Sequence, residues 1–235
     1  MKVHAVITAA GSSRRMGSVD KLLLELHGEP LLVRTLRPFL DYSRIGRLVV
    51  AVNPERVEEF TELFSRHFGP NRLITTAGGS HRQESILHAL RALSQAGAAD
   101  HEPVLVHDGA RPFVSAELFE LLLKALQEYE GVIPAAPVRD TVKRVNGSTV
   151  LGTEDRETLR LVQTPQAFAF SLLRRLHEQA AQEGFMGTDD ASLLERYGHR
   201  VGWVDGPVTN LKVTVPEDLV MLGFLAQQVT EGQPR

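Results

Sequence analysis

The chain has 235 residues, of which 43% are hydrophobic and 23% are charged, enough for one sizeable core. Its formal net charge is -3, so no overall positive field favours a nucleic-acid polymer or an anionic membrane. The absence of cysteine excludes disulfides, thiolate metal sites and a thiol nucleophile. With no apolar run near the roughly 18 residues of a membrane span and no signal-peptide core, we expect a cytoplasmic protein without membrane or nucleic-acid partners.

Short apolar runs alternate with segments of helical periodicity in the first half of the chain. The runs show little polar alternation, as expected when helices cover both faces of a sheet. This βαβ repetition predicts a doubly wound, mostly parallel, Rossmann-like α/β sheet. The strand candidates are 3–10, 47–53, 72–77 and 103–110, and the helix candidates are 30–42, 55–68 and 82–96.

The pattern changes at Gly131, where an apolar run with prolines precedes a polar, poorly periodic segment rich in Thr and Arg. We interpret this segment as an arm, at about 138–163, that protrudes from a single domain spanning 1–235. The remaining candidates are helices at 170–182 and 188–198, strands at 200–206 and 210–215, and a last helix from Pro216.

A loop of small and basic residues, AAGSSRRMGSVDK, follows the first strand from Ala9 to Lys21. Its glycine spacing matches neither the dinucleotide-binding fingerprint nor the P-loop. The small residues nevertheless let backbone N–H groups approach an anion, and the loop's cations, which include Arg14 and Arg15, can serve several phosphate oxygens. We interpret it as a triphosphate-binding loop; a flexible surface loop with solvated arginines is the alternative.

In open α/β sheets, ligands bind outside the carboxyl ends of the strands where the winding reverses. The loop at Gly11 leaves one such strand end, and Asp108 stands at another. If the two strands are neighbours, the basic loop and the carboxylate face one crevice. Asp108 is therefore a candidate Mg²⁺ ligand, because Mg²⁺ takes one or two carboxylates together with phosphate oxygens. A lone histidine such as His107 is interpreted as structural.

The segment GGSHRQES, residues 78–85, begins a predicted helix. Ser80, with Gln83 three residues later, has the pattern of a capping box. The preceding glycines permit close backbone approach, and a helix N-terminus that faces the crevice favours an anionic or polar nucleotide group.

These residues carry a resemblance to a known family. The loop alone resembles the signature of several nucleotidyltransferases, including the molybdenum-cofactor enzymes, whose Asp-Lys-Leu-Leu it matches. The later blocks resemble, in order, those of the 2-C-methyl-D-erythritol 4-phosphate cytidylyltransferase family, CTP-dependent enzymes of the non-mevalonate isoprenoid pathway. The blocks are AGGSHRQESILHAL, VHDGARPFVS, APVRDTVKRV, LVQTPQAF, TDDASLLERYG and NLKVTVPEDL, and they cover nearly the whole chain.

The resemblance implies a fold of the nucleotide-diphospho-sugar transferase type and transfer of CMP from CTP to methylerythritol phosphate, with Mg²⁺ on Asp108. It implies a homodimer in which the arm completes the neighbour's acceptor pocket, so that Thr141 and Arg156 serve the other subunit. Arg15, Lys21, Arg156 and Lys212 are the implied catalytic cations. Ala9, Ala10, Gly11, Gly79, Arg82 and Ser85 are the implied nucleotide-binding residues, and Arg111, Thr141, Arg156 and Lys212 the acceptor-binding ones.

The chain departs from the family pattern at three places. Ser13 stands where the family usually has a glycine, and Asp20-Lys21-Leu22 stands where it usually has Pro-Lys-Gln. The family also usually has an acidic residue near the position of Ser80. A carboxylate beside Lys21 either holds the lysine in place or competes with the phosphates. The alternatives to the cytidylyltransferase are a sister transferase acting on ribitol 5-phosphate or another acceptor, and a nucleotide-binding regulator without turnover.

Overall fold

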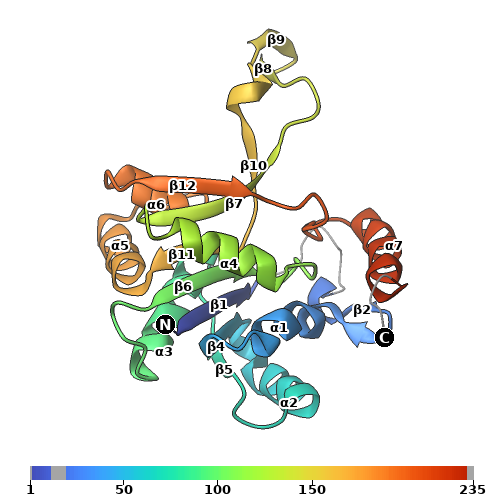
Figure 1. Ribbon diagram of the computed structural model, residues 1–235, viewed down its shortest axis with the longest axis vertical. Helices are drawn as coiled ribbons and strands as arrows, with labels where there is room; N and C mark the ends of the chain where they lie inside the picture. The colour runs from blue at the N-terminus through green and yellow to red at the C-terminus, as the bar shows by residue number, and fades with distance from the viewer. Residues whose placement is uncertain (1, 12–19, 232–235) are drawn as a thin grey trace.

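The computed structural model describes residues 2–11 and 20–231. It contains an eight-stranded sheet with helices on both faces and a hairpin that stands out from it (Figure 1). The sheet consists of β1 (Val3–Ala9), β4 (Ile45–Val52), β5 (Ile74–Ala77), β6 (Pro103–Asp108), β7 (Gly131–Pro137), β10 (Arg160–Val162), β11 (Gln166–Ala169) and β12 (Val201–Asp205). The helices are α1 (Leu31–Asp41), α2 (Val57–Phe68), α3 (Arg82–Gln95), α4 (Ala116–Ala125), α5 (Phe170–Glu183), α6 (Asp190–Arg196) and α7 (Pro216–Glu231).

Short elements complete the described chain. Two small antiparallel pairs are β2 (Glu25–Leu26) with β3 (Glu29–Pro30), and β8 (Lys143–Asn146) with β9 (Thr149–Thr153). Three 3-10 helices are η2 (Lys21–Leu23), η3 (Pro54–Arg56) and η4 (Arg156–Thr158). Among the described residues, no helix combines the length and the apolar character needed to cross a bilayer.

Strand β1 lies between β4 and β6 and is parallel to both, and β5 continues the parallel arrangement beyond β4. The winding therefore reverses at β1, and the carboxyl ends of β1 and β6 lie side by side. Thr8 and Asp108 are register partners at these ends. The expectation that the loop at Gly11 and the carboxylate of Asp108 leave neighbouring strands is confirmed.

Beyond β6 the sheet is mixed. β11 is antiparallel to both β6 and β7, β10 is antiparallel to β7, and the edge strand β12 is parallel to β7. The chain leaves the sheet through β7 and comes back through β10, so the returning strands run in the opposite direction. The expected doubly wound and mostly parallel α/β sheet is confirmed, with two antiparallel strands.

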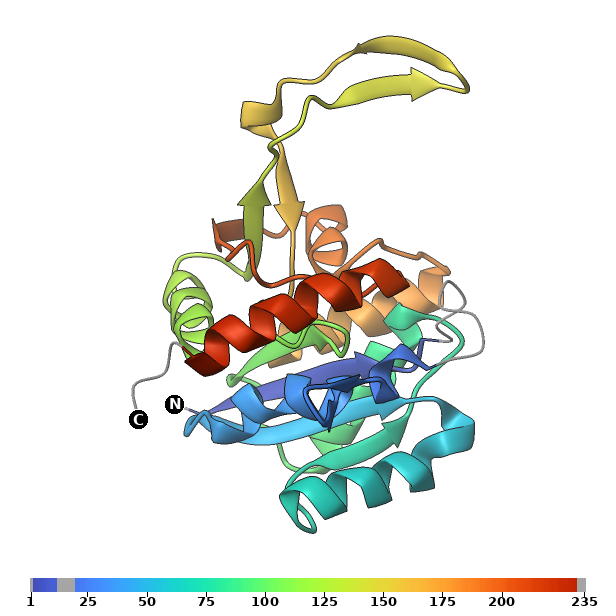
Figure 2. The same cartoon turned by 90° about the vertical axis from the view of Figure 1, so that its right-hand side faces the viewer.

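The central strands are apolar along their length because a helical layer covers each face of the sheet. On β1, Ala5 and Ile7 pack into one core cluster, whereas Val6 packs into the other. The first cluster is completed by α1, α2, α4 and α7, and the second by α3, α5 and α6 (Figure 2). Helix α4 is not among the elements predicted above.

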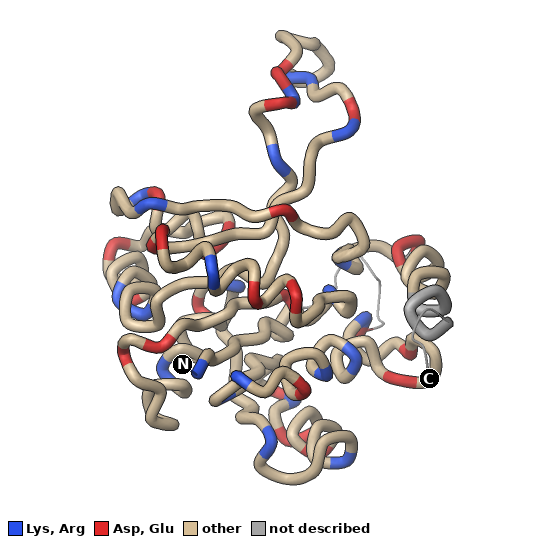
Figure 3. The backbone as a smooth tube through the Cα atoms, in the orientation of Figure 1, with Lys and Arg blue, Asp and Glu red and all other residues tan. Residues whose placement is uncertain are grey.

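The hairpin of β8 and β9 projects away from the sheet on two extended strands (Figures 1 and 2). Positive and negative segments alternate along the whole arm that carries this hairpin (Figure 3). Several apolar side chains are nevertheless exposed on the arm, including Val145, Val150, Leu151 and Leu161, each at 58%. A single chain leaves this apolar surface in solvent.

The prediction of a strand at 210–215 is wrong. This segment has no regular secondary structure and crosses the carboxyl ends of the sheet. It is held by one distant and two local contacts: the Val213 N–H donates to the Ala110 carbonyl over 2.9 Å, and the Thr214 hydroxyl and N–H both donate to Asp218. The last helix begins at Pro216, as predicted.

Candidate active site

A cavity of about 610 Å³ opens at the carboxyl ends of β1 and β6. Its walls come from the end of β1, the start of α3, the end of β6 and the segment around Lys212. The lining residues are Thr8, Ala9, Ala10, Gly11, Lys21, Leu22, Gly79, Ser80, His81, Arg82, Ser85, Asp108, Gly109, Ala110, Lys212 and Thr214. Eight of the predicted site residues, together with the predicted metal ligand Asp108, therefore line one cavity.

Asp108 is the acidic centre of this cavity, and three cations surround it. Its Oδ2 lies 2.8 Å from Lys212 Nζ and 3.7 Å from Arg111 Nε, and its Oδ1 lies 3.4 Å from Arg82 Nε. Burial alone would raise the pKa of this carboxyl, but the cations, Arg82 foremost, hold the pKa well below its usual range. Asp108 is therefore a carboxylate in the folded protein.

The backbone around Asp108 is fixed by His107 and Thr164. The Asp108 N–H donates to Thr164 Oγ1 over 3.0 Å, which leaves the Thr164 hydroxyl to donate to His107 Nδ1 over 3.1 Å. His107 Nε2–H then donates to the Arg111 carbonyl over 3.0 Å. His107 is fully buried and packs on Phe39, so its interpretation as a structural residue is confirmed.

The loop after β1 and the segment that leads into α3 approach each other closely at one wall of the cavity. A Cβ at Gly78 would lie 2.4 Å from the Cβ of Ala10, so only glycine allows this approach. The Gly79 N–H donates to Ser85 Oγ over 3.0 Å. The predicted nucleotide-binding residues thus lie on two segments in contact, the end of β1 with its following loop and the first turn of α3 with its preceding loop.

The prediction that Ser80 caps α3 is wrong by one residue. His81 is the N-cap, and its Nδ1 accepts from the Glu84 N–H over 3.2 Å. The Ser80 N–H and hydroxyl both donate to Glu84 Oε2, which a side chain at Gly79 would obstruct. The expected partner Gln83 instead binds the Phe185 carbonyl and the Gly187 N–H. An acidic group consequently lies beside Ser80 without being at that position.

Lys21 reaches the cavity from η2. Its Nζ donates to the Val213 carbonyl over 2.8 Å, which ties it to the segment that carries Lys212. Asp20 caps η2 through the Leu22 N–H, and its other carboxylate oxygen is 2.5 Å from Arg56 Nη1. Asp20 therefore pairs with Arg56 and caps the turn that carries Lys21, which favours the interpretation that this carboxylate holds the lysine in place. Arg14 and Arg15 lie outside the described residues.

The predicted acceptor residues divide into two groups. Arg111 lies beside Asp108 and donates from Nη1 to the Asn210 carbonyl over 2.6 Å, although it is not part of the cavity lining. Thr141 and Arg156 belong to the arm, where Arg156 Nη1 donates to the Arg139 carbonyl over 2.7 Å. Neither arm residue lines the cavity of its own chain.

Several site residues escaped the sequence analysis. Thr8, Ala110 and Thr214 line the cavity, and Thr164 and Asn210 hold its backbone. Strand-end position signals Thr8, and the blocks LVQTPQAF and NLKVTVPEDL contain Thr164 and Asn210. Asp190, which pairs with Arg82 over 2.8 Å, falls inside the block TDDASLLERYG. The blocks therefore pointed to segments, but the contacts of these residues needed the fold.

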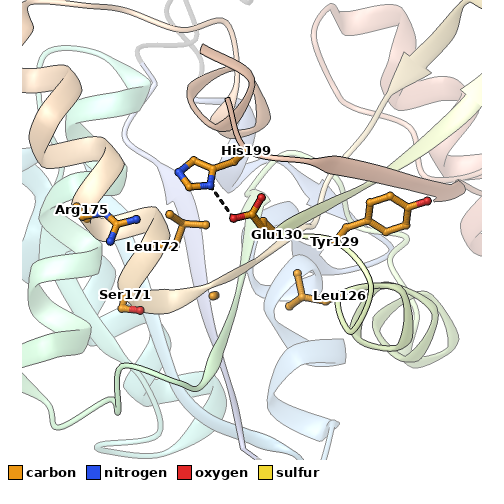
Figure 4. A pocket seen from close by; sticks show the side chains of 8 residues that line it. Leu126, Tyr129, Glu130, Ser171, Leu172, Arg175 and His199 are labelled. Atoms are coloured by element: carbon orange, nitrogen blue, oxygen red, sulfur yellow. Dashed lines mark hydrogen bonds and ion pairs between the residues drawn. The ribbon is translucent and has the colours of Figure 1, made fainter. Parts of the chain in front are cut away.

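A second cavity, of about 420 Å³, lies at the opposite end of β6 from Asp108 (Figure 4). Glu130 and His199 face each other across it at 2.7 Å, with Arg175 and Ser171 on the adjoining start of α5. None of the predicted site residues that the structure describes lines this cavity. The first cavity is therefore the candidate active site.

Comparisons with known proteins agree with this geometry. The model of the family described as 2-C-methyl-D-erythritol 4-phosphate cytidylyltransferase matches residues 3–228. The chain belongs to this family. The cytidylyltransferase of Geobacillus kaustophilus is 44% identical over 233 residues, which cover 98% of this chain and 100% of the relative. That of Bacillus mycoides is 43% identical over 217 residues, covering 92% of this chain and 94% of the relative.

Solved structures of cytidylyltransferases have the same architecture. The 4-diphosphocytidyl-2C-methyl-D-erythritol synthase from Anaerococcus prevotii superposes with a TM-score of 0.81 at 29% identity and covers 96% of this chain and 98% of its own. The cytidylyltransferase from Thermus thermophilus superposes with a TM-score of 0.76 at 34% identity and covers 94% and 98%. The α/β nucleotidyltransferase fold expected from the sequence is therefore confirmed.

Proposed function

We propose that the chain catalyses the reaction after which its family is named. It transfers CMP from CTP to 2-C-methyl-D-erythritol 4-phosphate and gives 4-diphosphocytidyl-2-C-methyl-D-erythritol and pyrophosphate. The observation that carries the proposal is the cavity where Asp108, Arg82 and Lys212 meet two glycine-containing loops. Such a site offers one acidic ligand and several cations to a triphosphate.

The reaction joins two anions, so positioning and charge neutralisation provide the catalysis. An oxygen of the acceptor phosphate attacks the α-phosphorus of CTP, the bond from this phosphorus to the bridging oxygen breaks, and pyrophosphate leaves with the electron pair. We assign Lys21, together with Arg15, to the charge that develops on the α-phosphate and pyrophosphate. Lys212 is assigned to the acceptor phosphate. Lys21 donates to the carbonyl of Val213, the residue after Lys212, which supports a role for both cations in one site.

The residues present fit a Mg²⁺ ion shared with the nucleotide. Asp108 supplies one buried, ionised carboxylate at the cavity wall, and Mg²⁺ keeps waters and phosphate oxygens in its remaining positions. Among the described residues, no cluster of three or more His, Asp or Glu side chains offers a complete protein cage. When bound, the ion supplies neutralisation and orientation of the phosphate oxygens.

The nucleotide side is assigned to Ala9, Ala10, Gly11, Gly79 and Ser85. Close packing of these small residues supports the assignment, because their backbone groups can approach a base and ribose directly. Arg82 adds a cation at the same wall. Asp108 would hold the metal at this wall, where Lys212 Nζ lies beside its Oδ2.

We further propose that residues 1–235 form one domain that acts as a homodimer in the cytoplasm. The exposed apolar side chains of the arm support dimerisation, since a partner's surface can bury them. Thr141 and Arg156 then bind the acceptor in the partner's site, and Arg111 completes the pocket beside Asp108. Their absence from the cavity lining of their own chain supports this exchange.

Pyrophosphate release tests the proposal. Each of the four common ribonucleoside triphosphates is combined with Mg²⁺ and with either methylerythritol phosphate or ribitol 5-phosphate. Release confined to CTP with methylerythritol phosphate supports the proposal. Release with ribitol 5-phosphate alone overturns the acceptor, and silence in every pair, with CTP still bound, favours the nucleotide-binding regulator.

A further inference from the structure

A carboxylate outside the cavity lining is buried against the back of the site. Asp190, the first residue of α6, is 1% exposed. Its Oδ2 lies 2.8 Å from Arg82 Nη2, and its Oδ1 accepts from His177 Nε2–H over 3.0 Å. His177, on α5, is also 1% exposed, and its Nδ1 has no hydrogen-bond partner among the described residues. Among the described residues, the His177 ring therefore makes one hydrogen bond, to Asp190.

Arg82 bridges this buried pair and the active site. One edge of its guanidinium reaches Asp190, its Nε lies 3.4 Å from Asp108 Oδ1, and its side chain is 29% exposed at the cavity wall. Arginine has five donors in a fixed plane, so two carboxylates on different nitrogens, Nε and Nη2, determine its orientation. The guanidinium keeps further N–H groups for a ligand in the cavity.

The helix starts that carry Arg82 and Asp190 are tied to each other. Gln83 donates to the Phe185 carbonyl and accepts from the Gly187 N–H, which binds the segment before α6 to α3. Gln166 donates to Asp189 Oδ2 and accepts from the Ala191 N–H, which fixes the first turn of α6 on β11. Four hydrogen bonds from two glutamine side chains therefore hold the backbone around Arg82 and Asp190 in place.

Stability alone gives little reason for this arrangement. Burying an ion pair removes two charges from water, and apolar residues of similar volume are often at least as stable. Burial would raise the pKa of Asp190, but Arg82 and His177 keep the pKa below its usual range, so the carboxylate stays charged. The Asp190 carboxylate also gives Arg82 a second anionic partner, so that Arg82 does not pair with Asp108 alone.

We propose that Asp190, supported by His177, is a positioning residue that orients Arg82 toward the nucleotide and limits the pairing of Arg82 with Asp108. The inference deepens the proposed function and rests on it. It predicts that Asp190 acts on catalysis only through Arg82. The block TDDASLLERYG thereby acquires a role that its sequence did not reveal.

A double-mutant cycle tests this dependence. Asp190→Asn is expected to lower kcat/KM for CTP by about 10- to 100-fold, as supporting residues of active sites typically do, with the KM for the acceptor unchanged. Arg82→Ala is expected to lower it at least as much, and the double variant should match Arg82→Ala alone. Asp190→Glu, which keeps the charge, should restore part of the activity. The proposal would be overturned if the double variant lost activity by the product of the two single losses, or if Asp190→Asn kept full activity.

Folding is followed separately by circular dichroism and thermal midpoint. If Asp190→Asn does not fold, His177→Leu takes its place in the cycle, and His177→Gln, which keeps an N–H donor, is the matched control expected to retain activity. The wild type with CTP and methylerythritol phosphate is the reference. If it releases no pyrophosphate, the proposed function fails, and the same cycle measured on the Kd for CTP decides the positioning role by the same criterion of non-additivity.

Discussion

Lys212 Nζ lies 2.8 Å from Asp108 Oδ2, so the cation proposed for the acceptor phosphate is paired with the carboxylate proposed for the metal. The pair holds the irregular segment 210–215 against the end of β6, and Lys21 reaches the same segment at the Val213 carbonyl. These two contacts join η2, the end of β6 and the segment 210–215 at one wall of the cavity.

Lys21→Ala should lower turnover on the order of a hundredfold or more, because a preorganised cation at the developing charge is lost. Lys124→Ala, on the exposed face of α4, is the matched control and should keep wild-type turnover. Initial rates of pyrophosphate release at saturating CTP measure both. Near-normal turnover in Lys21→Ala would remove this lysine from the mechanism.

Asp108→Asn should abolish the dependence on a divalent metal together with most of the turnover. The substitution keeps the size of the side chain but removes the charge that a hard cation requires. Binding of Mn²⁺ in the presence of CTP, followed by electron paramagnetic resonance, gives a readout independent of turnover. Equal Mn²⁺ affinity in wild type and variant would contradict the assignment of Asp108 to the metal.

The arm can be tested by mixing two inactive chains. Asp108→Asn disables the cavity, and Arg156→Ala disables the arm. A heterodimer isolated with two affinity tags should recover about half of the wild-type rate, because one of its two sites combines an intact cavity with the partner's intact arm. The two homodimers should stay inactive. No recovery in the heterodimer would mean that Arg156 acts within its own chain or outside the site.

His107 makes the stability of the fold depend on pH. Burial lowers the pKa of His107 to about 4, against about 6.5 in an unfolded chain. Between these values the unfolded state binds a proton that the folded state excludes, so the unfolding free energy should fall by up to about 3 kcal/mol as the pH decreases from 6.5 to 4. Urea titrations of wild type and His107→Gln measure the two slopes. The variant should be less pH-dependent in this window, and equal slopes would contradict the prediction.

The crevice could be predicted because it depends on local signals. One apolar strand ends in a loop of small residues, and another ends in Asp108. These two strand ends suffice to predict the crevice if the winding of the sheet reverses between the strands. The position of Lys212 could not be predicted in this way. Its segment alternates like a strand, but it lies across the strand ends and bonds to Ala110 and Asp218 instead of pairing with a neighbour.

Side-chain contacts between different helices could not be predicted from the sequence. Gln83 has the spacing of a capping residue, yet the segment before α6 offers it a carbonyl and an N–H at once, and this tertiary pairing prevails over the local cap. Asp190 and His177 lie on different helices, and their separation in sequence carries no signal for the contact with Arg82. The family blocks located these segments without giving their roles.

The most direct test of the account follows the phosphorus atoms of CTP. CTP labelled with ³²P at the α-position is incubated with the protein, Mg²⁺ and methylerythritol phosphate, and the products are separated. If CMP is transferred to the acceptor as proposed, the α-label appears in 4-diphosphocytidyl-2-C-methyl-D-erythritol, whereas a label at the γ-position leaves as pyrophosphate. Recovery of the α-label as free CMP, or in unreacted CTP alone, would contradict it.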